Sequence, residues 1–299
     1  MCCIADDDDL VDAAGHAAAA ASTSTGALSA FTNFVLQQLR PHPALDAALP
    51  GGPMRVTRVV PVQHALVGTF LQLHAADGTS RGSNPVLRPP NPTDADSVAA
   101  LAKLKSCFAD APGGFSRVVF AWHATRADLL HTVCRDGPRS LRLTDAGFFG
   151  AGSYFALEAA YAARYAKFGP PNAAGEFGVI LYAVSVSRAV PLTLGEHYRT
   201  PAEELNPAAS TAAVVPRRLH GFSRYYSGDA KVAPALSPNC DAHFVPVRHC
   251  GRTHPVDGAT PLPHDVDYQA CPAGRQAEGH ELVLLSHLRC TPVAIVYFR

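Results

Sequence analysis

A glycine-rich segment followed by tyrosines is the part of the sequence best suited to contact a ligand. Residues 147–168 read GFFGAGSYFALEAAYAARYAKF, with three glycines ahead of Tyr154. Glycine lets a backbone approach a ligand closely or adopt positive φ. The alanine-rich stretch behind the loop predicts a helix that carries Tyr161 and Tyr165. The segment therefore indicates a loop that presents Tyr154 in a cleft, although a loop-to-helix junction with tyrosines in the core fits the same residues.

Two further polar residues lie at the ends of predicted strands and are candidates for the same site. His123 follows the strand-like run 116–122, and Glu281 begins the run 281–285, whose other residues are all apolar. A carboxylate at Glu281 would lie at the edge of a core sheet. A histidine with a purely structural hydrogen bond and a surface carboxylate at a strand start are the alternatives for these two positions.

The elements that must position these residues read as short strands mixed with a few helices. Runs rich in β-branched residues predict strands at 55–67, 116–122, 178–186, 281–285 and 293–298. Helical spacing predicts helices at 27–40, 68–74, 94–108 and 127–135. Residues 191–240 and 248–279 read as irregular. Because strands and helices do not alternate regularly, the order favours α+β over a parallel α/β sheet.

Composition excludes several classes of function. Lys+Arg and Asp+Glu both number 25, so the chain has no general basic field that would bind nucleic acid in bulk. No run of 18 or more apolar residues is present, so we expect no membrane span. The eight cysteines are scattered over the chain rather than clustered, which predicts a reducing, intracellular compartment, cytoplasmic or nuclear.

Taken in order, these motifs make residues 54–299 resemble the catalytic domain of the poly(ADP-ribose) polymerase family, the diphtheria-toxin-like ADP-ribosyltransferases. The family pattern has a His at a strand end, a loop of the form GxFGxGxYF, a second Tyr eleven residues later and a late strand that opens with Glu. Here WHAT supplies His123, GFFGAGSYF supplies Tyr154 and HELVLL supplies Glu281. Tyr165 follows Tyr154 by eleven residues, and LRCTPVAIVYF resembles the family's closing strand.

The resemblance implies an NAD+-dependent ADP-ribosyltransferase, with NAD+ as substrate and no metal. It implies that the ring of His123 holds a ribose hydroxyl and that the backbone of Ala124 holds the nicotinamide carboxamide. Tyrosine rings stack favourably on a flat aromatic cation such as nicotinamide. The residues that the resemblance places on NAD+ are His123, Ala124, Thr125, Gly152, Tyr154 and Tyr165.

The catalytic set that the resemblance implies is Glu281, His123 and Tyr154. Glu281 would bind the 2′-hydroxyl of the nicotinamide ribose and stabilise the positive charge that develops as nicotinamide departs. Such a fixed carboxylate accelerates the reaction because that charge is largest in the transition state. Glu281 could also take a proton from an acceptor nucleophile.

The sequence departs from the family pattern at positions that contact nicotinamide. Ala124 stands where the family has a glycine after the His, and its methyl group would crowd the ligand. Ala162, eight residues after Tyr154, stands where the family often has a serine. Losing that hydrogen bond would weaken NAD+ binding by roughly 1 kcal/mol. These departures favour an alternative function, a catalytically weak or inactive NAD+-binding or interaction domain.

A separate stretch is rich in cysteine and histidine. Cys240, His243, His249, Cys250, His254, His264 and Cys271 offer enough nitrogen and sulfur ligands for zinc. Their spacing matches no zinc finger that we can name, and a histidine-rich surface loop is the favoured interpretation. We therefore expect no metal in this chain.

We expect an α+β protein with the ADP-ribosyltransferase fold. This fold has a split, two-sheet and mainly antiparallel β core, flanking helices and an NAD+ cleft between the sheets. Residues 1–53 would be a disordered or weakly helical segment and residues 54–299 the catalytic domain. The expected partner is a protein acceptor, with a nucleic-acid acceptor as the alternative. A transferase acting on phosphorylated RNA ends would need a basic cleft, which the balanced charge argues against.

Overall fold

The computed structural model describes residues 21–41, 45, 46, 49, 51–64, 67–80, 94–109, 118–138, 149–167, 169–193, 225, 240–247, 277 and 279–299. The helices among them are α1 (Ala21–Gln37), α3 (Val67–Ser80), α4 (Ala95–Ser106), α5 (Leu130–Asp136) and α6 (Ala159–Ala166), with short 3-10 turns η2 (Ala127–Leu129) and η6 (His287–Arg289). The strands are β1 (Val56–Pro61), β2 (Val118–Ala124), β3 (Ser153–Ala156), β4 (Phe177–Ser185), β5 (Ala189–Pro191), β6 (Ala242–Val247), β7 (Gly279–Leu284) and β8 (Cys290–Phe298).

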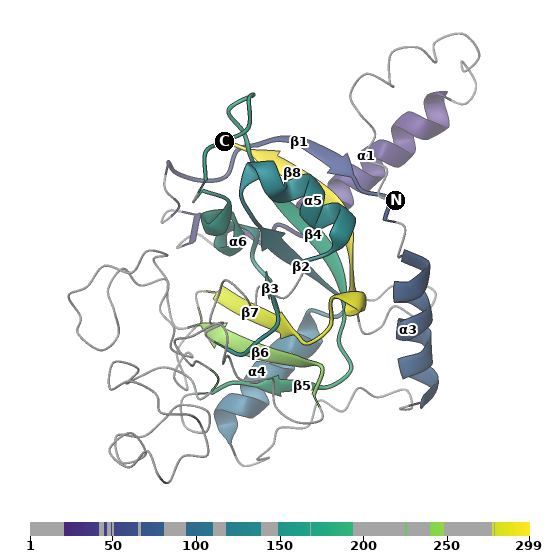
Figure 1. The fold of residues 1–299 in the computed structure, drawn as a ribbon, viewed down its shortest axis with the longest axis vertical. Coiled ribbons are helices and arrows are strands. Elements are labelled where there is room, and N and C mark those ends of the chain that lie inside the picture. The colour runs from purple at the N-terminus through teal and green to yellow at the C-terminus, as the bar shows by residue number, and fades with distance from the viewer. Residues whose placement is uncertain are drawn as a thin grey trace, which may run out of the picture.

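The eight described strands form one sheet in the order β1-β8-β4-β2-β3-β7-β6-β5. Every neighbouring pair is antiparallel except β5 and β6, which are parallel. Figure 1 shows β1, β8, β4 and β2 in one half and β3, β7, β6 and β5 in the other. The α+β class expected from the sequence is therefore confirmed at this level.

The expected division into two separate sheets is corrected, because hydrogen bonds run across the whole sheet. The join between the halves is nevertheless narrow. β2 and β3 share a single register pair, Trp122 with Ala156, whereas β2 and β4 share seven. The sheet is continuous but has its weakest connection between the strand of His123 and the strand of Tyr154.

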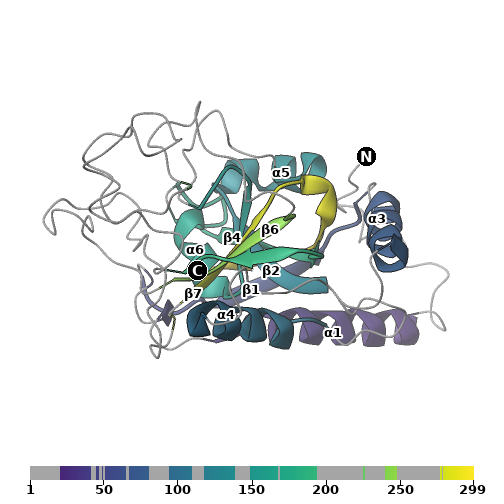
Figure 2. The ribbon, with the colours of Figure 1, turned by 90° about the horizontal axis from the view of Figure 1, so that it is seen from below.

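Two large apolar clusters lie between the sheet and the helices, and a small third one joins Phe70, Val118 and Ala183. The first cluster includes Trp122, Ala156, Tyr161, Leu181 and Val283. The second includes Phe155, Ile180, Tyr182 and Leu282. Residues alternate between the clusters along β3, β4 and β7, as side chains alternate between the faces of a sheet. Figure 2 shows α1 and α4 on one side of the molecule and α5 on the other.

The segment before residue 54 is part of the folded core in the region that the structure describes. Val35, Leu45 and Leu49 are buried in the first cluster. The indole Nε1 of Trp122 donates to the carbonyl of Gln38 at 2.9 Å. The sequence placed the domain start at residue 54, but these contacts attach α1 and the following turn to the centre of the sheet.

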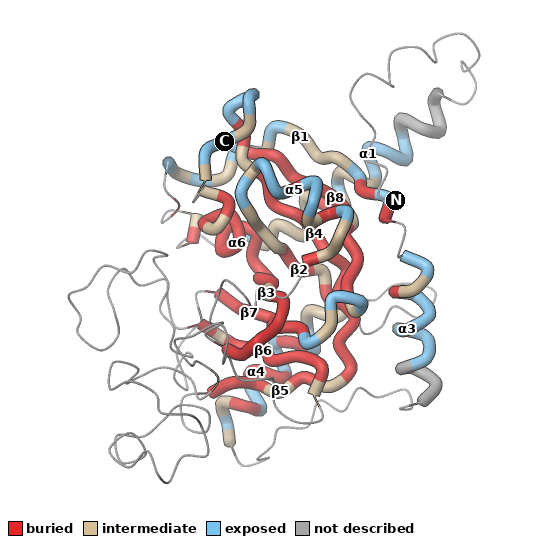
Figure 3. Tube along the Cα trace, viewed as in Figure 1, coloured by how far each residue is buried: buried red, intermediate tan, exposed pale blue. Residues whose placement is uncertain are grey.

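Several element boundaries differ from those expected. The strand predicted over 55–67 ends at Pro61, because the carbonyl of His64 accepts from the amide of Val67 and begins α3. β6 was assigned no element, since Pro246 interrupts its short apolar pattern. β7 begins at Gly279, so Glu281 is its third residue rather than its first. Strand pairing, which the sequence does not display, sets these limits. Figure 3 shows that the central strands are buried while α3 is largely exposed.

Candidate active site

Pairing between β2 and β3 stops next to the pair that joins the halves of the sheet. Beyond Trp122 and Ala156, β2 and β3 form no further register pair. The ring of His123 takes the place of a backbone partner there, because its Nδ1 lies 2.8 Å from the carbonyl oxygen of Tyr154. A carbonyl oxygen only accepts, so Nδ1 carries the proton and Nε2 is an acceptor in the neutral ring. Among the residues described, Nε2 of His123 has no hydrogen-bond partner.

The glycine-rich turn is held in place by the tyrosine that follows it. The hydroxyl of Tyr154 donates to the carbonyl of Gly150 at 2.7 Å and accepts from the amide of Phe149 at 2.9 Å. Gly150 has φ +106°, a conformation that favours glycine. Nδ1 of His243, on β6, lies 2.7 Å from the carbonyl of Phe149. The hydroxyl of Tyr154 therefore fixes its own loop, while Tyr154 packs against the first cluster.

Gly152 is required for a close approach of two backbones. A Cβ atom at this position would lie 2.5 Å from the carbonyl oxygen of Leu284 and 2.7 Å from Cγ1 of Val283. Neither distance is tolerable for a real side chain. Gly152 therefore lets the start of β3 lie directly against β7, which is a packing role.

Tyr154 and Glu281 lie on the same face of the sheet. Ala156 pairs with Glu281 between β3 and β7, and Tyr154 is two residues before Ala156 on the same strand. Glu281 and Val283 lie on one face of β7 and Leu282 on the other, and Val283 belongs to the first cluster. The strand order thus brings the loop tyrosine and the late glutamate together, although 127 positions separate them in the chain.

Glu281 is a buried carboxylate with a defined donor. Its exposed fraction is 4%, and that of Tyr161 is 1%. The hydroxyl of Tyr161, on α6, donates to Oε1 of Glu281 at 2.5 Å. This O–O distance is in the range of hydrogen bonds to an ionised acceptor. The donated hydrogen bond opposes the effect of burial on the charged form of Glu281 and fixes the direction in which the carboxylate points.

His123 lies on the other face of the sheet from Glu281. Its ring centroid is 5.7 Å from that of Phe155 and 6.3 Å from that of Tyr182, both in the second cluster. Burial lowers the pKa of His123 below its ordinary value, and the hydrogen bond to the carbonyl of Tyr154 opposes this shift. The three residues of the implied catalytic set are therefore close in the sheet, but the side chain of His123 leaves it on the opposite side.

Two of the remaining residues implied to bind NAD+, Ala124 and Tyr165, border the same face as Glu281. Ala124 ends β2 and packs against the first cluster, as does Tyr165. The ring of Tyr165 meets that of Tyr161 edge to face, with centroids 6.3 Å apart. Ala162 is buried on α6, where a serine hydroxyl would have faced the first cluster. Thr125 follows β2 and is half-buried.

Three polar residues near the site were not singled out as functional from the sequence. The carboxylate of Glu158 accepts from the amide of His280 at 2.9 Å and lies 2.7 Å from its Nδ1. Glu158 precedes the alanine-rich helix, a position where an acidic residue is typical. Tyr161 is the third, and it is one turn of helix before Tyr165. The partnership of Tyr161 with Glu281 has no local signal, because it joins residues 120 positions apart.

The cysteine- and histidine-rich stretch is only partly described. Cys240 and His243 are placed, whereas His249, Cys250, His254, His264 and Cys271 lie outside the described residues. Burial, followed by the negative charge of Asp241, raises the pKa of the Cys240 thiol to about 11. Within the described part of the chain, no group of three or more Cys, His, Asp or Glu side chains could hold a metal ion.

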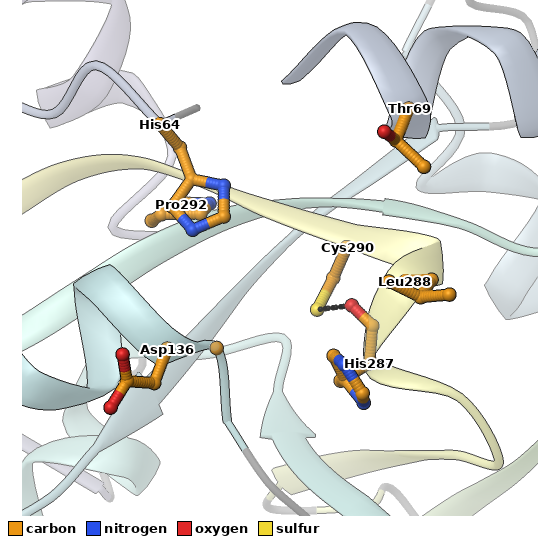
Figure 4. Close-up of a pocket in the computed structure, with 8 residues that line it drawn as sticks. His64, Thr69, Asp136, His287, Leu288, Cys290 and Pro292 are labelled. Carbon is orange, nitrogen blue, oxygen red and sulfur yellow. Dashed lines mark hydrogen bonds between the residues drawn. The ribbon is translucent and has the colours of Figure 1, made fainter. Parts of the chain in front are cut away.

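A shallow pocket elsewhere on the molecule contains none of the candidate residues. It lies beside α3, the end of α5 and η6 (Figure 4). The thiol of Cys290 donates to the carbonyl of His287 at 3.2 Å, and Nε2 of His64 lies 3.1 Å from the carbonyl of Arg135. The residues that line it are His64, Thr69, Asp136, Gly137, His287, Leu288, Cys290 and Pro292. This pocket is separate from the site around Glu281.

No helix in the described ranges is both long and apolar enough to cross a membrane. The chain matches no protein-family model, and no curated protein matches it in sequence.

Proposed function

We propose that this chain is an NAD+-dependent ADP-ribosyltransferase, which moves ADP-ribose from NAD+ to a protein acceptor and releases nicotinamide. The observation that carries the proposal is the buried carboxylate of Glu281, oriented by Tyr161 on the sheet face that also bears Tyr154. A carboxylate fixed in a water-poor site stabilises positive charge more strongly than one in bulk water.

The proposed reaction breaks the bond between the nicotinamide nitrogen and C1′ of the ribose. The bonding electron pair leaves with nicotinamide, and a lone pair of the acceptor forms the new bond to C1′. Glu281 stabilises the positive charge that develops on the ribose. The same carboxylate accepts the proton that the acceptor loses. Glu281 therefore provides charge stabilisation and base catalysis with no change in its position.

The tyrosines and the histidine would bind the dinucleotide. The rings of Tyr154 and Tyr165 supply aromatic faces to nicotinamide, while the hydroxyl of Tyr154 stays with its loop. Nε2 of His123 is an acceptor where β2 and β3 stop pairing, and there it would take a hydrogen bond from a ribose hydroxyl. On this proposal, the NAD+ cleft of an ADP-ribosyltransferase fold lies beside the Trp122–Ala156 pair, where β2 and β3 stop pairing.

A second candidate function is an NAD+-binding or interaction domain without turnover. Two observations favour it. Tyr161 already occupies one oxygen of Glu281, and the ring of His123 faces the opposite side of the sheet. The methyl group of Ala124 and the absence of a hydroxyl at Ala162 would add to the weakness of such a site. This candidate differs from the first in predicting NAD+ binding without release of nicotinamide.

The acceptor and the location belong to the proposal as well. A protein side chain is the acceptor that we favour, and a nucleic-acid end is the alternative. We place the protein inside the cell, in the cytoplasm or nucleus, because its eight cysteines are scattered along the chain.

Transfer of radioactive label from NAD+ labelled in its adenylate phosphate tests the proposal. The full chain is compared with Glu281→Gln and with Glu176→Gln. Glu176 is a matched control because it is also buried, at 6% exposure, but bonds Thr57 and Arg58 beside β1. We expect label on protein with the wild type and Glu176→Gln, and none with Glu281→Gln. Label that is unaffected by Glu281→Gln, or a wild type that transfers none, would overturn the proposal. In the second case, a rise in Tm with added NAD+ would support the binding domain.

A further inference from the structure

Tyr161 contacts β7 through both its hydroxyl and its ring. The hydroxyl contacts Glu281, and the ring lies against Gly279. The ring also belongs to the first cluster, and the hydroxyl donates to Oε1 of Glu281 at 2.5 Å. A Cβ atom at Gly279 would lie 2.9 Å from Cδ2 of Tyr161, so the strand passes directly over the ring. The tyrosine thus contacts β7 at two places on either side of His280.

Residues at the start of α6 also bind His280, which lies between Gly279 and Glu281. The carboxylate of Glu158 accepts from the backbone amide of His280 at 2.9 Å, and the amide of Leu157 donates to the carbonyl of His280 at 3.0 Å. Glu158 and Tyr161 are at the start of α6. Residues 279–281 are therefore fixed by one short segment, and the carboxylate of Glu281 is the group that this arrangement orients.

The direction of the hydrogen bond shows what the hydroxyl does to the carboxylate. A tyrosine hydroxyl has one proton, and an ionised carboxylate is acceptor-only. Donation by Tyr161 stabilises the charged form of Glu281 and restricts the rotation of its carboxylate. A phenylalanine at this position would fill the same space in the cluster and would do neither.

We propose that Tyr161 is a positioning residue for Glu281, which sets the direction and the charge of the carboxylate during transfer. This inference rests on the proposed transferase function. Tyr161 acts through Glu281 and touches no substrate atom. The resemblance gives Tyr161 no role, so the assignment depends on the contact with Glu281 alone.

Tyr161→Phe tests the role, because it removes one oxygen atom and keeps the ring. We expect kcat for nicotinamide release to fall about 10- to 100-fold, since the lost bond is one to a charged group. We expect KM for NAD+ to change less than about threefold, because the ring contacts persist. The acidic limb of the pH profile should move to higher pH, since the carboxylate loses a donor.

Tyr297→Phe is the matched control. Tyr297 is also buried, at 5% exposure, and lies on β8, where its ring contacts Arg58. Its kcat and pH profile should superimpose on those of the wild type. A Tyr161→Phe profile that also superimposes would overturn the positioning role while leaving the transferase proposal intact.

A second measurement does not depend on turnover. The carboxyl signal of Glu281 is followed by NMR in protein labelled with carbon-13 at glutamate side chains, and Glu281→Gln assigns it. We expect the titration midpoint of this signal to rise in Tyr161→Phe and to stay in place in Tyr297→Phe. An unchanged midpoint in Tyr161→Phe would overturn the inference even with an active enzyme. A wild type that releases no nicotinamide overturns the transferase proposal, and the role of Tyr161 in transfer with it.

If Tyr161→Phe does not fold, 3-fluorotyrosine at position 161 replaces it. Fluorine makes the phenol more acidic and a stronger donor, and it preserves the hydroxyl. The acidic limb and the titration midpoint should then move to lower pH. Movement to higher pH, or no movement, would contradict the proposed role.

Discussion

Trp122 and Ala156 form the single register pair between β2 and β3 in the described sheet. The two residues that follow α1 stabilise this junction, because the indole of Trp122 donates to the carbonyl of Gln38 and the amide of Ala159 donates to the carbonyl of Leu39. One half of the sheet carries His123, and the other carries Tyr154 and Glu281. The relative position of the candidate site residues therefore depends on a joint that the residues after the N-terminal helix support.

Tyr154→Phe should destabilise the protein through its loop. The substitution removes the acceptor for the amide of Phe149 and the donor to the carbonyl of Gly150. We expect the free energy of unfolding to fall by about 1–3 kcal/mol, measured by urea denaturation. Tyr182→Phe is the control, because its hydroxyl makes a longer, 3.3 Å contact with the carbonyl of Val133. A loss in Tyr154→Phe no larger than that in the control would show that the loop does not depend on this hydroxyl.

Gly152→Ala should separate β3 from β7 locally. The added methyl group meets the carbonyl oxygen of Leu284 at 2.5 Å, a backbone atom that cannot turn away. Overpacking of this kind costs typically about 1–3 kcal/mol, and here we expect the upper end in urea denaturation. Gly68→Ala, on exposed α3 with nothing within 4 Å, should instead stabilise by about 0.5–1 kcal/mol. Equal effects at the two glycines would contradict the close approach.

His123→Asn should change how stability depends on pH. The folded-state pKa of His123 is lowered by burial below the ordinary value of 6.5, so the unfolded chain takes up this proton first as the pH falls. The contribution of His123 to the free energy of unfolding of the wild type is complete above about pH 6.5. It declines as the pH falls from there towards the folded-state pKa. Asparagine keeps a side-chain donor for the carbonyl of Tyr154 and does not titrate. Unfolding free energies between pH 7.5 and 5 should therefore converge, or cross in favour of the variant, as the pH falls.

The control for this measurement is Thr132→Asn, on the exposed surface of α5, which introduces the same residue without removing a titrating group. The free-energy difference between wild type and Thr132→Asn should stay constant over the same pH range. A constant difference for His123→Asn as well would contradict the burial of a neutral ring at the joint.

Long β-branched runs made much of the sheet predictable from the sequence. β2, β4 and β8 lie where their composition placed them, and α4 begins directly after Asp94, whose carboxylate accepts from the amide of Asp96 and caps the helix. β6 was missed because it is short and contains Pro246, and its strand character comes from pairing with β7. The burial of Val35, ahead of the boundary predicted at residue 54, had no local signal because it depends on a cluster that distant strands and α6 complete.

The candidate site was predictable only as separate parts. The loop glycines and the positions of Tyr154 and Glu281 were visible as motifs. The pairing of Ala156 with Glu281 and the hydrogen bond from Tyr161 depend on sheet register across more than a hundred residues. The face on which His123 lies was equally hidden, because it depends on where β2 stops pairing with β3. Local sequence patterns therefore predict which residues are candidates, whereas the register of the strands determines which of them contact one another.

Release of nicotinamide from NAD+ by the wild type and by Glu281→Gln tests the central claim most directly, with NAD+ binding to each measured by calorimetry. The transferase account predicts that the wild type releases nicotinamide, whereas Glu281→Gln binds NAD+ and releases at least about a hundredfold less, because the charge that stabilises the transition state is gone. A wild type that binds NAD+ without releasing nicotinamide, or a Glu281→Gln variant that releases it at the wild-type rate, would contradict the account.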